Sequence, residues 1–250
     1  MNENYRVTLA HAVGSETGGT SGKAGDQTGK EVRLQEWYIS GGNKWDFVLR
    51  CKEKKQRWLI AEDAVKGVRN KNLGYSQQDR YSAWNIVARR GFDLDLLDEP
   101  ANCDCSQLAS IASNYAGFAI PKDTYTGNMK ARYSATGGFK ILTANKYVKD
   151  YKALKRGDLL VREGHHTATV ANTIYWLKSN LKKGAAGRTP DVKALQTRLN
   201  EIANAYLDVD GDFGPKTELA VKNFQYDNNL DVDGIVGRDT ATALGMIYGE

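Results

Sequence analysis

The sequence is poor in cysteine and histidine and has no long apolar run. It holds three cysteines and three histidines in 250 residues. Three scattered cysteines do not form the framework of a disulfide-rich protein, and they fit a reducing compartment. No apolar stretch approaches the roughly 20 residues that cross a bilayer, so we expect no membrane insertion. The first residues lack a basic segment followed by an apolar core, so they do not predict a secretory signal, and we expect synthesis in the cytoplasm.

Charge is divided unevenly along the chain. Residues 1–187 contain 29 Lys and Arg against 19 Asp and Glu, a net charge of +10, whereas residues 188–250 contain 6 against 11, a net charge of −5. A basic body could meet nucleic acid or an anionic cell wall. The runs "RCKEKKQR" and "KALKR" are interrupted by acidic and apolar residues, which indicates a solvated face, and we expect no nucleic-acid partner.

A change of composition marks a domain boundary. The segment "LKKGAAGRTPD", residues 181–191, is small, basic and rich in Gly and Ala, and its proline suits the start of a helix. We therefore predict a linker over residues 181–190, between a domain of residues 1–180 and a domain of residues 191–250.

An internal repeat of 23 residues lies in the C-terminal part: "LDVDGDFGPKT" at 207–217 recurs as "LDVDGIVGRDT" at 230–240. Each copy places an Asp-Gly turn before a Thr that can cap a helix. The helical patterns around the repeats predict a small all-α module of three helices. A calcium loop is the alternative for the clustered carboxylates, but the glycine follows the second acid directly and no Glu closes the loop, so calcium is disfavoured.

Five features of this module follow a known pattern: "VKALQ" at 192–196, "DGDFG" at 210–214, "AVKNFQ" at 220–225, "DGIVG" at 233–237, and Thr240. On these the module resembles the small peptidoglycan-binding domain appended to many cell-wall hydrolases, over nearly its whole length. The resemblance implies that bacterial peptidoglycan is the partner. Because the module is acidic, attraction of its net charge to an anionic wall cannot explain binding, and we expect the contacts to come from a groove between helices.

Residues 1–180 have a mixed pattern of strands and helices. Alternating β-branched segments predict strands, and apolar residues at helical spacing predict helices, the last of which ends at Gly117. The predicted strands are "YRVTLAHAV" (5–13), "KEVRLQEWYI" (30–39), "WDFVLRCK" (45–52) and "HHTATVANTIYW" (165–176), and the predicted helices are "AEDAVKGVRN" (61–70), "RYSAWNIVARRG" (80–91) and "SQLASIASNYAGF" (106–118).

The stretch "ANCDCSQLASIAS", residues 101–113, places Cys103 and Cys105 one residue apart. A zinc site normally needs four ligands, and the adjacent His165 and His166 would point to opposite faces of a strand. A disulfide between the two cysteines would close a small, strained ring. With metal and disulfide both disfavoured, a reactive thiol and a buried core cysteine remain as interpretations.

The residues after Cys105 favour the reactive thiol. Apolar side chains fall at i, i+3, i+4 and i+7, which predicts a helix that begins near Cys105 and buries one face, formed by Leu108, Ile111, Ala112 and Tyr115. A thiol in the first turn lies at the positive end of the helix dipole, and we expect this position to lower its pKa.

The segment "KRGDLLVREGHHTATV", residues 155–170, supplies a base. A Gly-Asp turn leads into a strand, and a histidine opens the next strand. Together with "DCS" at a helix start, this pattern resembles the NlpC-type, papain-like cysteine peptidases of cell walls. The resemblance implies an α+β fold with a central antiparallel sheet and packed helices, and neither metal nor cofactor. Carried over, Cys105 is the nucleophile and His166 the base, while His165 points away.

The same resemblance assigns supporting residues. Asp104 and Ser106 flank the nucleophile and are expected to contact the substrate, and Tyr75 in "LGYSQQDRYSAW" is expected beside the thiolate. Backbone N–H groups at the helix start are expected to stabilise the oxyanion. Gln107 stands where the family usually has a glycine after Asp-Cys-Ser.

The N-terminal segment, residues 9–50, carries pieces that in such lysins ordinarily follow the histidine strand: a strand with His-Ala, a Gly-rich loop with Asp-Gln-Thr-Gly, and a strand ending in Val-Leu-Arg. The simplest interpretation is a circular permutation. It predicts that the strand "YRVTLAHAV" lies beside "HHTATVAN" and that His11 completes the catalytic set by orienting His166. The alternative is a buried strand histidine in an unrelated extension.

These resemblances together imply a phage or prophage endolysin that cleaves stem-peptide amide bonds and reaches the wall by holin-type release. An endopeptidase is favoured, and an N-acetylmuramoyl-L-alanine amidase with the same Cys/His groups is the alternative within the enzyme class. A non-catalytic wall-binding protein is the alternative outside it. The sequence does not define the roles of Cys51 and Cys103 or the oligomeric state.

Overall fold

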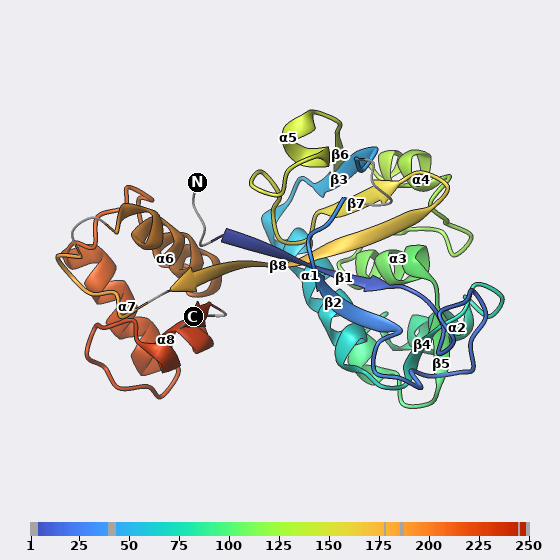
Figure 1. The fold of residues 1–250 in the computed structure, drawn as a ribbon, viewed down its shortest axis with the longest axis horizontal. Helices are drawn as coiled ribbons and strands as arrows, with labels where there is room; N and C mark the ends of the chain where they lie inside the picture. Colours follow the sequence, from blue (N-terminus) through green and yellow to red (C-terminus); the bar gives the residue numbers. More distant parts are fainter. Residues whose placement is uncertain (1–4, 40–43, 178, 186–187, 245, 249–250) are drawn as a thin grey trace. The chain divides into compact units, whose positions relative to one another are not determined.

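The computed structural model describes residues 5–39, 44–177, 179–185, 188–244 and 246–248. The chain is α+β, as predicted, and it divides into two compact units. We call Val7–Thr173 the N-terminal unit, and Ile174–Glu250 together with Met1–Arg6 the C-terminal unit (Figure 1). Among the described residues, no helix combines the length and apolarity needed to cross a membrane.

A sheet organises the N-terminal unit, with strand order β2–β1–β8–β7–β3–β6. Adjacent strands are antiparallel in the pairs β1/β2, β7/β8, β3/β7 and β3/β6. β1 lies beside β8, so the N-terminal strand occupies the place that the permutation predicted (Figure 1). The strands are β1 (Tyr5–Ala12), β2 (Val32–Glu36), β3 (Phe47–Cys51), β6 (Phe139–Leu142), β7 (Leu159–Arg162) and β8 (His166–Leu177).

Three helices cover one face of this sheet: α1 (Lys54–Arg69), α3 (Cys105–Tyr115) and α4 (Met129–Ala135). Alternate residues of the strands meet apolar positions of the helices in a shared core, and α1 packs along α3. Members of this core include Ala10, Phe47, Leu49, Ile60, Ala64, Ala109, Ala112, Tyr133 and Val161. Because strand side chains alternate between faces, His11 is directed away from the face that carries Ala10 and Ala12.

A smaller two-stranded element supports the start of α3. β4 (Leu73–Tyr75) and β5 (Ala101–Cys103) are parallel, with Tyr75 opposite Cys103. Near them lie the short helix α2 (Ser82–Val87) and two turns of 3-10 helix, Ala88–Arg90 and Leu94–Leu96. The remaining helix of the unit, α5 (Asn145–Val148), contacts β3.

The C-terminal unit contains three helices, which confirms the predicted module: α6 (Thr189–Ile202), α7 (Pro215–Asp227) and α8 (Arg238–Ala243), followed by the short strand β9 (Ile247–Tyr248). Their apolar faces form a separate core that includes Leu195, Leu199, Phe213, Val221 and Phe224. Proline is at the start of both α6 and α7, where its missing N–H is not needed.

Each of the two repeated Asp-Gly segments is hydrogen-bonded in the same way to the side chain of a buried glutamine. In the first, Nε2 of Gln196 donates to Oδ1 of Asp210 at 2.7 Å, and Oε1 accepts the N–H of Gly211 at 2.9 Å. The second repeats these bonds with Gln225, Asp233 and Gly234, at 2.8 and 2.9 Å. The carboxylates that suggested a calcium loop are therefore used as acceptors for amide donors.

The division between the units falls before the predicted linker. Leu181, the first residue of that linker, is fully buried in the C-terminal core and bridges to Val236. α6 already begins at Thr189. The segment with the composition of a linker thus contributes its first residue, Leu181, to the core of the C-terminal unit.

Candidate active site

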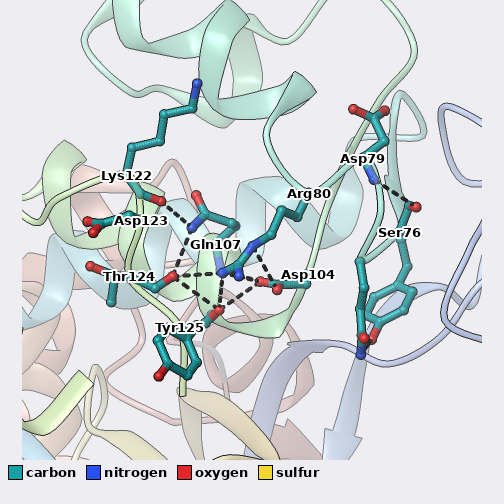
Figure 2. Close-up of polar contacts among 12 residues, drawn as sticks. Ser76, Asp79, Arg80, Asp104, Gln107, Lys122, Asp123, Thr124 and Tyr125 are labelled. Carbon is teal, nitrogen blue, oxygen red and sulfur yellow. Dashed lines mark hydrogen bonds and ion pairs between the residues drawn. The ribbon is translucent and has the colours of Figure 1, made fainter. Parts of the chain in front are cut away.

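The start of α3 is held by a capping and ion-pair network (Figure 2). Oδ1 of Asp104 accepts hydrogen bonds from the N–H of Gln107 and the hydroxyl of Ser106, both at 2.8 Å. Nε of Arg80 lies 3.0 Å from Oδ2 of the same carboxylate. Asp104 and Ser106 are 7% and 1% exposed. Their oxygens hold the helix start, and their contact with substrate stays a prediction.

Two side chains tie a neighbouring loop to the same helix start (Figure 2). The guanidinium of Arg80 donates to Oγ of Ser106 at 2.8 Å and to the carbonyl of Thr124 at 2.7 Å. Nε2 of Gln107 donates to the carbonyls of Lys122 and Thr124 at 2.8 and 3.0 Å. The buried Gln107 side chain therefore binds this loop to the start of α3.

Cys105 opens α3 and its side chain is buried. The backbone N–H groups of Ser106 and Thr167 lie near enough to its sulfur to favour the thiolate. Thr167 follows His166 at the start of β8. The fold thereby brings the thiol against the strand that begins with the predicted base.

Desolvation has the largest effect on the pKa of this thiol. Burial raises the pKa of Cys105 to about 12, and the adjacent Asp104 carboxylate acts in the same direction. The two backbone N–H groups and Arg80 act in the opposite direction, with smaller effect. The expectation that the helix start lowers the pKa is therefore wrong for this geometry, because removing a thiolate from water outweighs the field of the helix terminus.

A pair of histidines joins β1 to β8. Nδ1 of His11 lies 3.0 Å from Nε2 of His166, which connects residues 155 positions apart. The hydroxyl of Tyr38 lies 3.3 Å from the same Nδ1. The buried ring of Trp45 lies 6.2 Å, centroid to centroid, from the ring of His166. The placement of β1 beside β8 therefore brings His11 into contact with His166.

All three polar groups of this cluster are uncharged at neutral pH. Burial, followed by the charges of His166 and Arg33, lowers the pKa of His11 to about 3. Burial also lowers the pKa of His166 to about 4. Burial first, and then the charge that Cys105 can carry, raises the pKa of Tyr38 to about 12. The site at rest is a set of neutral hydrogen-bonding groups.

Tyr75, which the resemblance places beside the thiolate, pairs with Cys103, two residues before Cys105. It is 5% exposed at the end of β4, and its hydroxyl accepts a hydrogen bond from Nε2 of Gln77 at 2.9 Å. Burial raises the pKa of its phenol, and the charge that Cys105 can carry adds to the rise.

Sequence reasoning missed Arg80, Tyr38 and Glu31. Glu31 is 1% exposed and accepts the N–H groups of Tyr75 at 3.0 Å and of Gln27 at 2.8 Å, which fastens the Gly-rich loop to β4. A local signal existed only for Glu31, a carboxylate at the edge of an apolar strand. Nothing close in sequence relates Arg80 or Tyr38 to Cys105.

The remaining candidates lie outside this cluster. His165 is exposed in the turn before β8, as expected. Cys51 and Cys103 are buried free thiols, and Cys103 is fully buried on β5. Within the part of the chain that the structure describes, no three His, Cys, Asp or Glu side chains gather in a way that could hold a metal ion.

Parts of the chain are similar to lytic enzymes. A 64-residue stretch is 41% identical to a spore cortex-lytic enzyme of Halalkalibacterium halodurans and covers 26% of this chain and 19% of that enzyme. A 62-residue stretch is 44% identical to an autolytic lysozyme of Clostridium acetobutylicum and covers 25% of this chain and 19% of that protein. The chain thus spans about a fifth of the length of these relatives.

Similarity to a solved structure covers a comparable share of the chain. The crystal structure of the SleB N-terminal domain is 37% identical over 28% of this chain and 93% of that domain, with a TM-score of 0.26.

Two family models account for most of the sequence. Residues 188–244 match the model described as "Putative peptidoglycan binding domain", which agrees with the three-helix module. Residues 9–173, nearly the whole N-terminal unit and about two thirds of the chain, match the model of the Endolysin-like domain. The chain, with its buried thiol and histidine pair, therefore belongs to the Endolysin-like domain family.

Proposed function

We propose that the protein is a peptidoglycan hydrolase that cleaves an amide bond of the wall's stem peptides, with Cys105 as nucleophile. The observation that carries this proposal is the hydrogen-bonded pair of His11 and His166, at the strand start against which the thiol lies. Membership of the Endolysin-like domain family and the match to a wall-binding module support the substrate. The names of the relatives, a cortex-lytic enzyme and an autolytic lysozyme, point to the same polymer.

In the proposed reaction, Nδ1 of His166 accepts the thiol proton while its Nε2–H donates to Nδ1 of His11. The sulfur attacks the carbonyl carbon, a C–S bond forms, and the carbonyl electron pair moves to oxygen. Collapse of this intermediate breaks the C–N bond, and His166 returns the proton to the departing amine. Water, deprotonated by His166, then cleaves the thioester to give a carboxylate and restore the thiol.

The neutral resting state makes His166 a general base in this scheme. Because burial raises the pKa of Cys105 and lowers that of His166, a preformed thiolate–imidazolium pair is disfavoured before substrate binds. Proton transfer then accompanies attack on the carbonyl. His11 is a positioning residue: as a neutral acceptor it selects the tautomer of His166 that leaves Nδ1 free.

The α+β sheet with the thiol helix packed on it supports an NlpC-type, papain-like assignment with a permuted strand order. The C-terminal module would hold the enzyme on its polymeric substrate, which raises the local concentration of scissile bonds. The phage origin and the holin-type release that the resemblance implies remain predictions.

Replacement of the thiol tests the proposal. Cys105→Ala should lose at least about a thousandfold of the lytic activity on purified sacculi, since the nucleophile is removed, while wall binding persists. The matched control is Cys103→Ala, which removes a buried thiol two residues away and should keep activity. Alanine is preferred to serine there, because a hydroxyl at a fully buried position on β5 would lack a partner. Lysis by the Cys105→Ala variant at the wild-type rate would overturn the proposal.

Mass spectrometry of the released fragments identifies the bond. An endopeptidase creates new amino groups within stem peptides or cross-bridges, and an amidase frees the amino group of the first alanine. A glycosidase is the second candidate function, because one relative is named a lysozyme. It would create new reducing sugar ends and no new amines, so the products distinguish all three.

A further inference from the structure

The C-terminal unit contains a groove that the proposed chemistry does not use. It has a volume of about 510 Å³ and lies between the turn after α6 and one face of α7. Its floor includes Phe224, and small alanines form part of its wall. The side chains that could recognise a ligand are Asn204, Tyr206, Lys216, Leu219, Asn223 and Asp227.

Tyr206 is presented to solvent at the rim of this groove. Its side chain is 91% exposed, and its φ of 52° lies in the left-handed region that non-glycine residues seldom adopt. Leu219 on α7 is 60% exposed. Folding gains little from a large aromatic ring left in water, and apolar groups clustered at a concave surface typically mark a binding site.

The charges of the groove limit what can occupy it. Lys216 and Asp227 carry opposite charges, so the lining is neutral overall. The sequence from residue 188 onward carries a net charge of −5, which disfavours a polyanion. The amides of Asn204 and Asn223 each offer donors and an acceptor, which match the hydroxyl and acetamido groups of an uncharged sugar.

We propose that this groove binds the glycan strand of peptidoglycan through an N-acetylated sugar whose apolar ring face stacks on Tyr206. The inference rests on the proposed function for its ligand class and specifies which component of the wall the module recognises. A glycan ligand leaves the stem peptides free for Cys105.

The test uses the full chain with Cys105→Ala, so that the wall is not digested. Calorimetric titration with tetra-N-acetylchitotetraose should show saturable binding. Tyr206→Ala should weaken that binding, and the pull-down with sacculi, by about tenfold, because the sugar loses the aromatic ring on which it stacks. Tyr226→Ala is the matched control, because Tyr226 is 75% exposed on α7 and does not line the groove. It should bind as the parent does.

Asn223→Ala provides a second variant whose loss of binding does not depend on the backbone at Tyr206. Thermal unfolding of each variant establishes that the module remains folded. The inference is overturned if the tetrasaccharide does not bind, if Tyr206→Ala and Asn223→Ala bind like the parent, or if only stem-peptide fragments bind. Lytic activity measured separately with native Cys105 decides the proposed function, so the two can fail independently.

Discussion

The two units differ in whether their buried polar side chains have hydrogen-bond partners. In the C-terminal unit, Gln196 and Gln225 use both ends of their amides, and no buried polar atom among its described side chains lacks a hydrogen-bond partner. In the N-terminal unit, Oε1 of Gln107, Oδ1 of Asn102 and Oδ2 of Asp63 are buried without one. Satisfied networks define a rigid scaffold, whereas unsatisfied groups are expensive to keep and concentrate where function requires them.

The two units also differ in how far the pKa values of their side chains are shifted. The N-terminal unit holds the groups whose pKa is moved far by burial: His11 to about 3, His166 to about 4 and Cys105 to about 12. In the C-terminal unit the resolved pKa shifts are downward shifts at two carboxylates, exposed Asp210 and half-buried Glu218, caused first by hydrogen bonds. Strongly shifted groups that meet at one place are a physical sign of a reactive site.

The largest expected effect belongs to His11, whose loss tests whether the N-terminal unit contains a reactive site. His11→Ala should fold, as judged by circular dichroism, yet lose about a hundredfold to ten-thousandfold in kcat, because His166 loses the acceptor that selects its tautomer. His165→Ala is the matched control, since His165 is exposed beside the same strand. Turnover of His11→Ala close to that of the control would show that the pair is structural.

The hydrogen bonds of Gln196 and Gln225 to the Asp-Gly segments should contribute strongly to the stability of the C-terminal unit. Gln196→Ala or Gln225→Ala should lower the free energy of unfolding of that unit by about 2 to 4 kcal/mol, because each removes a buried amide and leaves a glycine N–H and a buried threonine hydroxyl without that partner. Denaturant unfolding of the full chain measures this. Thr197→Ala is the control: this residue is half-buried on α6 and its hydroxyl bonds only within the helix, so stability should change by less than about 0.5 kcal/mol.

Gln107→Ala tests whether a buried amide in the N-terminal unit matters more for activity than for stability. We expect a smaller loss of stability, about 1 to 2 kcal/mol, because one end of this amide is already unpaired. The release of the loop at Lys122 and Thr124 should in addition lower kcat, an effect that the module variants should not show on a soluble substrate. If Gln196→Ala or Gln225→Ala lowered kcat as much as Gln107→Ala does, the proposed difference between the two units would be wrong.

The pH profile gives the smallest expected change. His166 must be uncharged to accept the thiol proton, and burial lowers its pKa to about 4. Activity should therefore change by less than about twofold between pH 7 and 5.5 and fall only as the pH approaches 4, not near the ordinary histidine value of 6.5. His11→Asp should move this acid limb to higher pH, because a carboxylate stabilises the imidazolium. An unshifted limb in that variant would show that the residue at position 11 does not act on His166.

The sequence by itself determined the features that depend on neighbours along the chain. The apolar residues at helical spacing after Cys105 predict a helix that begins near this residue, and the structure has α3 at Cys105–Tyr115. The repeated Asp-Gly segments likewise predict the three-helix module. Such signals are local, because capping and periodicity involve residues within a few turns of each other.

Tertiary structure alone decided what meets Cys105 and how it ionises. Family resemblance suggested that His11 lies beside His166, but only strand pairing across 155 positions brings their ring nitrogens to 3.0 Å. Arg80 and Tyr38 join the site without any sequence signal. The pKa of the thiol moved against the sequence-based expectation, because desolvation depends on every atom packed around the sulfur, and no local pattern contains that information.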